Sequence, residues 1–284
     1  MNAIEIRDLS KRLNEFELNI DKLDIKKGYI TGFVGPNGSG KTTTIKLIMN
    51  MLFKDSGSIK IFEKENDIES LDIKAIIGYV GETPGYMQDS KLKAIKKGIS
   101  CFYKNWNENI YKRYIKQFKL DENKKYKELS KGQQKKFELV MELSHNPKLI
   151  IMDEPTANLD PLVRNEFLDI LQEHIEKEDA TVFYSTHITS DLDKVADYLV
   201  FIFEGKVILY GDKESILENH KIIRGNKELL DIETKKELIS YNENSFGFEG
   251  LAKNIKSAYE VFGEEVIYDN ANLEDILMYY TKEC

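Results

Sequence analysis

The chain has 284 residues, enough for one large domain or two small ones with a buried core. Its composition is that of a globular protein, with 41% hydrophobic and 32% charged residues and no low-complexity segment. The formal net charge of -8 argues against a nucleic-acid-binding protein that works by neutralising phosphates. We therefore expect no nucleic-acid partner.

Cysteine usage and hydropathy indicate a cytoplasmic protein. Cys101 and Cys284 lie far apart and form no C-x-x-C pair, which favours free thiols in a reducing cytosol. The N-terminus carries charges where a signal peptide is apolar. The apolar runs 149–152 and 198–203 are too short to cross a bilayer. Any contact with a membrane is therefore expected to be made through a partner.

The first 80 residues are predicted to be mostly strands. The third strand runs into a glycine-rich loop at 35–40, and helical periodicity follows from Lys41 to Leu52. The predicted strands span residues 3–9, 16–23, 29–34, 58–62 and 75–80.

The middle of the chain changes character. Residues 91–103, 108–118 and 133–144 favour helix, with no strong strand signal between them. We expect these helices to form an insertion, at about 83–146, into a sheet.

Buried-strand character returns at 149–152 and 181–185, with a predicted helix at 161–176 between them. A hairpin is predicted from strands 197–203 and 206–210. Strands that alternate with helices favour a mostly parallel sheet with helices on its faces.

No functional motif follows residue 213. Residues 214–284 mix charged and aromatic residues and end in a predicted helix at 273–280, capped by Asn272 with Asp275 at the third helical position. This segment is predicted to be a small appended subdomain, and the sequence does not indicate its role.

Residues 35–42 match the phosphate-binding pattern G-x-x-x-x-G-K-[ST] between a strand and a helix. The glycines let consecutive N–H groups turn towards phosphate oxygens, and the helix start adds its dipole. Lys41 is expected to reach the β- and γ-phosphates, Thr42 to bind Mg²⁺, and Thr43 to support the α-phosphate. A chance match occurs in about one chain in a hundred of this length. The predicted ATP-binding residues of this loop are Gly35, Pro36, Asn37, Gly38, Ser39, Gly40, Lys41, Thr42 and Thr43.

A predicted buried strand ends in two carboxylates, Asp153 and Glu154. Ligands of parallel sheets bind at the carboxyl ends of strands, where these residues emerge. Asp153 can hold Mg²⁺ through its water shell, and Glu154 is placed to act as general base on an attacking water. A strand that leaves a sheet through Asp-Glu-Pro is an equally good explanation on its own; the phosphate loop favours the functional one.

Together with these motifs, three further segments resemble one family, the ATP-binding cassette (ABC) ATPases. Residues 129–133, Leu-Ser-Lys-Gly-Gln, resemble the family signature Leu-Ser-Gly-Gly-Gln. Residues 156–160 resemble the loop that meets the opposite subunit, and residues 185–187 resemble the switch that carries a histidine. The motifs occur in the family's order and cover roughly residues 1–213.

The resemblance implies an α/β fold: a P-loop NTPase core with a mostly parallel sheet, an N-terminal antiparallel β subdomain and an inserted helical subdomain. The cassette would span 1–213, and 214–284 would be a small C-terminal extension. Ser130, Gly132 and Gln133 would face the γ-phosphate held by a second cassette, at a helix start suited to anions.

His187 would contact the γ-phosphate and hold the water and Glu154, for which a neutral imidazole suffices. Asp160 would couple the two sites across the interface. The alternatives are structural: Ser130 as a helix cap, His187 as a structural histidine, and Asp160 as the N-cap before Pro161.

Three positions depart from the family pattern. Glu82 stands where a glutamine usually senses Mg²⁺, and its carboxylate can still accept from hydrated Mg²⁺. Leu13 stands where an aromatic usually stacks on adenine; Phe16 either stacks from a shifted position or belongs to the core, with core slightly favoured. Lys131 replaces a signature glycine and adds a positive charge near a phosphate site.

The aromatic residues Phe102 and Trp106 lie in the helical insertion, which grips the membrane subunit in this family. They are either exposed docking anchors or, as an i, i+4 helical pair, part of the insertion's own core.

The function expected from this resemblance is the ATPase subunit of a transporter, which lies on the inner face of the cell membrane. ATP would close a dimer, homomeric or heteromeric, and hydrolysis would reopen it to drive a separate integral membrane permease. Export of drugs, peptides or lipids is favoured.

Two alternatives differ in class. A soluble non-transport cassette acting on ribosomes or DNA is disfavoured by the single cassette and by the lack of a heptad run or cysteine cluster. A P-loop kinase or GTPase would explain the phosphate loop but not the signature or the histidine.

Overall fold

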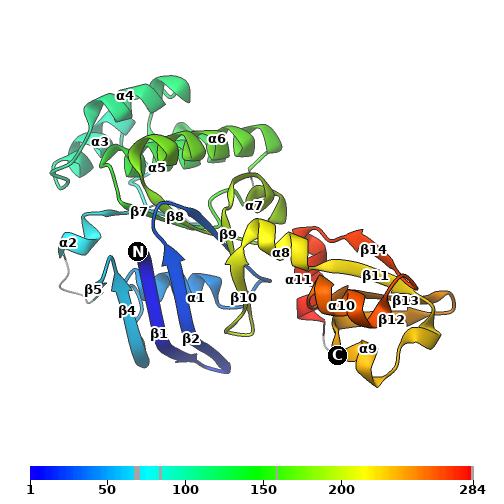
Figure 1. Ribbon diagram of the computed structural model, residues 1–284. Helices are drawn as coiled ribbons and strands as arrows, with labels where there is room; N and C mark the ends of the chain where they lie inside the picture. Colours follow the sequence, from blue (N-terminus) through cyan, green and yellow to red (C-terminus); the bar gives the residue numbers. More distant parts are fainter. Residues whose placement is uncertain (67–70, 83–84, 158, 283–284) are drawn as a thin grey trace.

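Three β-sheets organise the residues that the structure describes, and helices cover the central sheet (Figure 1). The computed structural model describes residues 1–66, 71–82, 85–157 and 159–282. Thr83 at the predicted start of the insertion, Asn158 of the predicted loop and Cys284 lie outside these residues.

The first sheet is antiparallel and confirms the predicted N-terminal β subdomain. Inward-facing Ile4 and Ile6 alternate with the more exposed Glu5 and Arg7, as expected for a sheet with one buried face. Its strands, in spatial order, are β2 (Phe16–Lys26), β1 (Asn2–Leu13), β4 (Ser56–Ile61) and β5 (Lys64–Glu65).

The second sheet is the core of the molecule and confirms the predicted mostly parallel arrangement. Five of its strands are parallel, and β10 closes one edge in the antiparallel sense. Its strands, in spatial order, are β10 (Lys206–Asp212), β9 (Tyr198–Phe203), β3 (Ile30–Val34), β8 (Thr181–Thr186), β7 (Leu149–Asp153) and β6 (Ile77–Val80).

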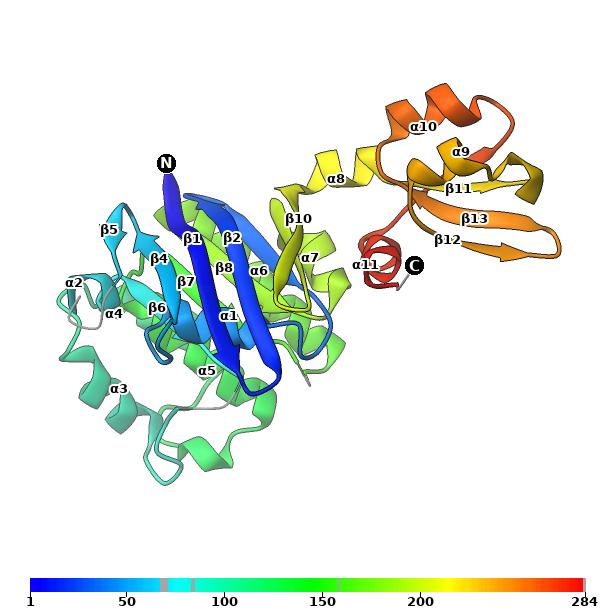
Figure 2. The same cartoon turned by 90° about the horizontal axis from the view of Figure 1, so that it is seen from below.

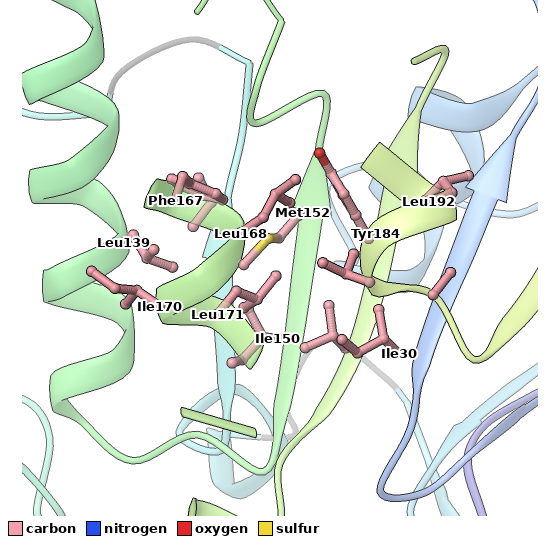
Figure 3. Close-up of a cluster of buried hydrophobic side chains, with 14 of the residues drawn as sticks. Ile30, Leu139, Ile150, Met152, Phe167, Leu168, Ile170, Leu171, Tyr184 and Leu192 are labelled. Carbon is pink, nitrogen blue, oxygen red and sulfur yellow. The ribbon is translucent and has the colours of Figure 1, made fainter. Parts of the chain in front are cut away.

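Both faces of this sheet are buried, which is why its strands are nearly continuous apolar runs. Ile150 and Met152 face one side and pack with α5 (Lys131–Ser144), α6 (Pro161–Glu178) and α7 (Thr189–Val195). Figure 3 shows side chains of α6 against this face. Leu149 and Ile151 face the other side and pack with α1 (Lys41–Ile48) and the first sheet. Each such buried aliphatic side chain contributes roughly 1.5–3 kcal/mol to folding.

The predicted insertion, at about 83–146, spans α3 (Leu92–Ser100), α4 (Glu108–Gln117) and α5, and the short α2 (Leu71–Lys74) precedes it. Because α3 ends at Ser100, the prediction that Phe102 and Trp106 form an i, i+4 helical pair is wrong. Phe102 is 82% exposed. Trp106 is half-buried, and its Nε1 donates to Glu108 Oε2 at 3.2 Å.

The C-terminal extension contains a third sheet that the sequence analysis did not predict. Its connectivity is β-α-β-β-α-β, with antiparallel strands in the order β12-β13-β11-β14, which is a ferredoxin-like arrangement. Its elements are α8 (Lys213–Asn219), β11 (Lys221–Gly225), α9 (Ile232–Lys236), β12 (Leu238–Asn244), β13 (Gly247–Ala252), α10 (Ile255–Phe262), β14 (Ile267–Asn270) and α11 (Leu273–Thr281).

Helix α11 confirms the predicted helix at 273–280, including the capping box between Asn272 and Asp275. It lies between the cassette and the third sheet (Figures 1 and 2). Tyr279 faces the sheet, and its hydroxyl donates to Glu249 Oε1 at 2.8 Å. The neighbouring Tyr280 ring packs near Phe201 of the central sheet. Within the described residues, no helix has the length and apolar character needed to cross a membrane.

His174 is a buried titratable group of the core. It is 0% exposed, and its Nδ1 lies 3.3 Å from Tyr114 Oη. Burial lowers the pKa of His174 from 6.5 to about 4. Between these values the unfolded chain binds the proton and the folded chain does not, so stability falls as pH drops from 6.5 towards 4 and is complete above 6.5.

We therefore predict that His174→Gln, which does not titrate, flattens the pH dependence of stability. Between pH 7 and pH 5 the native protein should lose roughly 2 kcal/mol more unfolding free energy than the variant. Urea unfolding at both pH values measures this difference. An equal loss in both proteins would contradict the buried neutral state of His174.

Candidate active site

The predicted site residues of the cassette core emerge from four strands of the central sheet. β3 leads into the loop 35–40, β7 ends in Asp153 and is followed by Glu154, β8 is followed by His187, and β6 precedes Glu82. These strands are parallel neighbours in the order β3-β8-β7-β6. Their carboxyl ends therefore meet at one edge of the sheet, where ligands of open α/β sheets bind.

The loop between β3 and α1 requires glycine at specific positions. A Cβ on Gly35 would lie 2.2 Å from the backbone oxygen of Ile202, so no side chain fits there. Gly40, immediately before α1, has a φ of 110°, which side-chain-bearing residues rarely adopt. The loop can thus turn its backbone towards the cavity at the start of α1.

Lys41 holds this loop from inside. Its side chain is only 6% exposed, and its Nζ donates to Gly35 O at 2.7 Å and Pro36 O at 3.2 Å. The same Nζ lies 3.5 Å from Glu154 Oε1. A buried ammonium group is therefore shared between backbone carbonyls and a carboxylate at the mouth of the site.

Thr42 and Asp153 place two oxygen-bearing side chains next to each other. The Thr42 hydroxyl donates to Asp153 Oδ1 at 3.2 Å, and Asp153 is 2% exposed. Burial raises the pKa of the Asp153 carboxyl, and the hydrogen bond from Thr42 partly offsets that rise. A hydroxyl and a desolvated carboxylate side by side fit Mg²⁺, which accepts few protein carboxylates and keeps other oxygen ligands.

Glu154 and His187 are in direct contact. Glu154 Oε2 lies 2.8 Å from His187 Nδ1 and accepts from the His187 backbone N–H at 3.3 Å. An ionised carboxylate only accepts, so Nδ1 carries the proton. Glu154 has a φ of 49°, and its N–H donates to Ser185 O at 3.0 Å. A left-handed backbone residue thus turns the carboxylate towards the neighbouring strand.

A cavity of about 610 Å³ joins these groups. It is lined by Leu13, Phe16, Asn37, Gly38, Gly40, Lys41, Thr42, Thr43, Glu82, Glu154, Ala157 and His187. A second cavity of about 670 Å³ adjoins it and shares Phe16, Asn37 and Gly38. Phe16 is half-buried against the core of the first sheet, and its remaining surface lines both cavities.

The signature residues lie elsewhere in the chain. Neither cavity is lined by Ser130, Gly132 or Gln133 in the part of the chain that the structure describes. Ser130 caps α5: its hydroxyl accepts from the Gln133 N–H at 3.2 Å, and the Gln133 side chain accepts from the Ser130 N–H at 3.1 Å. Gly132 lets α5 approach α6, because a Cβ there would lie 3.0 Å from Val163.

Asp160 is the N-cap of α6, as one of its two predicted roles requires. Its Oδ1 accepts from the backbone N–H groups of Leu162 and Val163 at 3.1 and 3.0 Å. Sequence reasoning missed Tyr184 and Asp191, two buried polar residues that flank His187 in the chain. The available signal was an acid in the first turn of the helix after the histidine.

A parallel sheet that carries a phosphate loop with its lysine, a hydroxyl beside a buried aspartate, and a glutamate–histidine pair at one edge defines a P-loop nucleoside triphosphatase.

Comparisons with known proteins narrow this class. Residues 18–157 match the family model described as ABC transporter. Lantibiotic transport ATP-binding protein SrtF of Streptococcus pyogenes is 33% identical over 237 residues, which cover 78% of this chain and 97% of that protein. Bacitracin transport ATP-binding protein BcrA of Bacillus licheniformis is 31% identical over 211 residues, which cover 72% of this chain and 68% of that protein.

The fold comparison agrees. The structure of cbiO1 from Clostridium perfringens, part of the ABC transporter complex cbiONQ, has a TM-score of 0.66 and 25% identity. The match covers 76% of this chain and 90% of that one. The chain belongs to the ABC transporter family and is an ATP-binding subunit, an ATPase, of that family.

We predict that Lys41→Ala weakens ATP binding by about ten- to a hundredfold, because it removes a charge-assisted contact to phosphate and leaves Glu154 without its buried cation. Isothermal titration with ATP measures the affinity. Lys46→Ala is the matched control, since Lys46 lies on the same helix with its side chain exposed. Equal affinities of the two variants would contradict the role of Lys41.

Proposed function

We propose that two copies of this cassette, or this cassette and a related one, close on ATP at the cytoplasmic face of a membrane and drive export through a separate permease. The observation that supports ATP hydrolysis in this proposal is the contact of Glu154 with both His187 and Lys41 at the mouth of one cavity. It brings a carboxylate base, an imidazole and a phosphate-binding cation together.

The loop supplies the phosphate site. Backbone N–H groups of the loop residues 35–40 other than Pro36 surround the phosphates, and Lys41 contacts the β- and γ-phosphates. Thr42 and Thr43 follow at the start of α1, where the helix dipole favours anions. Phe16, whose ring borders both cavities, stacks on the base in place of the usual aromatic.

Thr42, Asp153 and Glu82 are the residues that would hold Mg²⁺. When bound, the cation neutralises charge on the phosphate oxygens. Thr42 and Asp153 already contact each other, and Glu82 lines the same cavity and adds to the negative charge that Asp153 experiences. A glutamate at position 82 can therefore replace the usual glutamine near hydrated Mg²⁺.

Glu154 acts as the general base for the attacking water, and His187 orients it. In the present geometry a neutral His187 uses its Nδ1 proton on Glu154. To donate to the γ-phosphate, the imidazole must therefore change its hydrogen-bond partner or bind a second proton. If the phosphates of bound ATP attract Lys41 away from Glu154, the Glu154 carboxylate becomes free to accept a proton from the attacking water.

A second cassette completes the site. Ser130 is exposed at the start of α5, and neither cavity includes it within one chain. A facing copy brings that helix start, with Gly132, Gln133 and the added charge of Lys131, to the γ-phosphate.

The permease docks in a groove between the central sheet and the helical insertion. This groove of about 440 Å³ has an apolar wall that includes Met49, Met51 and Tyr86, and Glu138 and Glu142 also line it. Gly81, also in its lining, immediately precedes Glu82. A permease that contacts Gly81 can therefore shift the neighbouring Glu82 at the proposed Mg²⁺ site.

Export is favoured because the relatives SrtF and BcrA are named for lantibiotic and bacitracin transport. Neither those names nor the fold comparison favours a cassette that acts on ribosomes or DNA.

We predict that Glu154→Gln keeps ATP bound, accumulates as a dimer and slows hydrolysis by at least about a hundredfold, the contribution of a general base. Size-exclusion chromatography with ATP and a phosphate-release assay measure both effects. Glu176→Gln, an exposed glutamate of α6, is the matched control. Normal hydrolysis in E154Q would remove Glu154 from the role of base.

We predict that Met51→Asp weakens co-purification of a polytopic membrane protein, because it places a charge in the apolar wall of the groove. Met51 is 55% exposed, so the folded cassette should keep its ATPase activity. Met278→Asp is the matched control, since Met278 is 44% exposed on α11. Equal recovery of the membrane protein with both variants would place docking elsewhere.

A further inference from the structure

A buried polar cluster lies behind the Glu154–His187 pair. It consists of Thr156, Tyr184 and Asp191, all at most 2% exposed, and none of the three lines the cavity. Thr156 Oγ1 lies 2.5 Å and Tyr184 Oη lies 2.8 Å from Asp191 Oδ2. The two hydroxyl oxygens are 2.8 Å apart. We call these three residues the hydroxyl–carboxylate cluster.

The cluster joins the two turns that carry the proposed reacting groups. Thr156 lies two residues after Glu154, in the turn that follows β7. Tyr184 lies in β8, three residues before His187, and Asp191 lies in the first turn of α7, four residues after it. One carboxylate therefore ties the segment behind Glu154 to both sides of His187.

The chemistry of the cluster makes these contacts strong. Asp191 accepts from two hydroxyl groups, and hydrogen bonds to a charged acceptor are stronger than neutral ones. Burial and the neighbouring Asp191 charge raise the pKa of Tyr184 well above its ordinary value, so its hydroxyl remains a donor. Arg164 Nε, 3.8 Å from Asp191 Oδ1, adds a positive charge on the other oxygen.

The turn after β7 needs such an anchor. Glu154 adopts a left-handed φ of 49°, which costs free energy for a residue with a side chain. Its N–H contact with Ser185 O fixes the backbone on one side, and Thr156 fixes it on the other. Loss of the Thr156 contact would let Glu154 relax away from His187.

We propose that Asp191 is a positioning residue. Through Thr156 and Tyr184 it holds Glu154 and His187 in the relative positions that hydrolysis requires. The inference rests on the proposed function, in which those two residues act on the attacking water. Because the cluster touches neither cavity nor phosphate loop, its loss should lower kcat and leave the KM for ATP nearly unchanged. A displacement of about 1 Å in a reacting group can cost about a hundredfold in rate.

A purely structural cluster would instead lower stability without a selective loss of kcat. The chain offers a matched control for this alternative. Tyr114 is, like Tyr184, 0% exposed and hydrogen-bonded through its hydroxyl, but it lies in α4 and contacts His174. Tyr184→Phe and Tyr114→Phe therefore remove the same group from equally buried sites.

The test measures kcat, KM for Mg-ATP and thermal stability of Tyr184→Phe, Tyr114→Phe, Thr156→Val, Thr156→Ser and Asp191→Asn. We expect kcat to fall about tenfold or more in Y184F, T156V and D191N, with KM within about twofold. Y114F and T156S, which keep the cluster's hydroxyl groups, should stay within about twofold in kcat. A kcat for Y184F no lower than that for Y114F would overturn the proposal, as would equal kcat for T156V and T156S.

If D191N fails to fold, Y184F and T156V still test the same cluster. Glu154→Gln separates this inference from the function on which it rests. If E154Q stops hydrolysis while Y184F and T156V hydrolyse normally, the cluster does not position Glu154 and only this inference fails. If E154Q hydrolyses normally, the assignment of the base fails and the inference fails with it.

Discussion

The site depends on one constraint, the parallel register of four neighbouring strands. Val34 pairs with Thr186, Asp153 with Ser185, and Val80 with Met152. Residues just beyond these pairs are therefore held at the same height along the sheet, although they come from distant parts of the chain. The register is itself fixed by burial on both faces, since a shift of one residue would exchange Ile150 and Met152 with Leu149 and Ile151.

Electrostatics at this edge follow from that register. Three carboxylates, Asp153, Glu154 and Glu82, come together, and burial raises the pKa of Asp153. Lys41 offsets part of this charge through Glu154. The phosphates of bound ATP would compete with Glu154 for Lys41. The accompanying cation would balance the negative charge of Asp153. In the proposed function, the same binding event therefore stabilises the acidic edge and releases the base, so ATP binding and activation of Glu154 are one process.

The sequence predicted the central sheet well because buried parallel strands are apolar runs that end in polar residues. The contact of Glu154 with His187 was expected only from the family resemblance, because it depends on a left-handed backbone at Glu154 that no local pattern indicates. Sequence reasoning also missed the third sheet. Strands there are four to seven residues long, and Arg224 bonds to Glu249 and Asp269 across three of them, so the apolar alternation is interrupted. Tertiary pairing, rather than local pattern, makes those segments strands.

Helix α7 shows how the ferredoxin-like subdomain connects to the site. Asp191 is held by the hydroxyl–carboxylate cluster, and Leu192 packs against Gly32 of β3, where a Cβ would lie 2.7 Å from its Cδ2. Helix α11 contacts α7 from the side of the third sheet. The segment after His187 is thus fixed by the β7 turn, the central sheet and the C-terminal helix at once. His187 itself remains half-exposed, so its ring can change partner while its backbone stays in place, as the proposed hydrolysis requires.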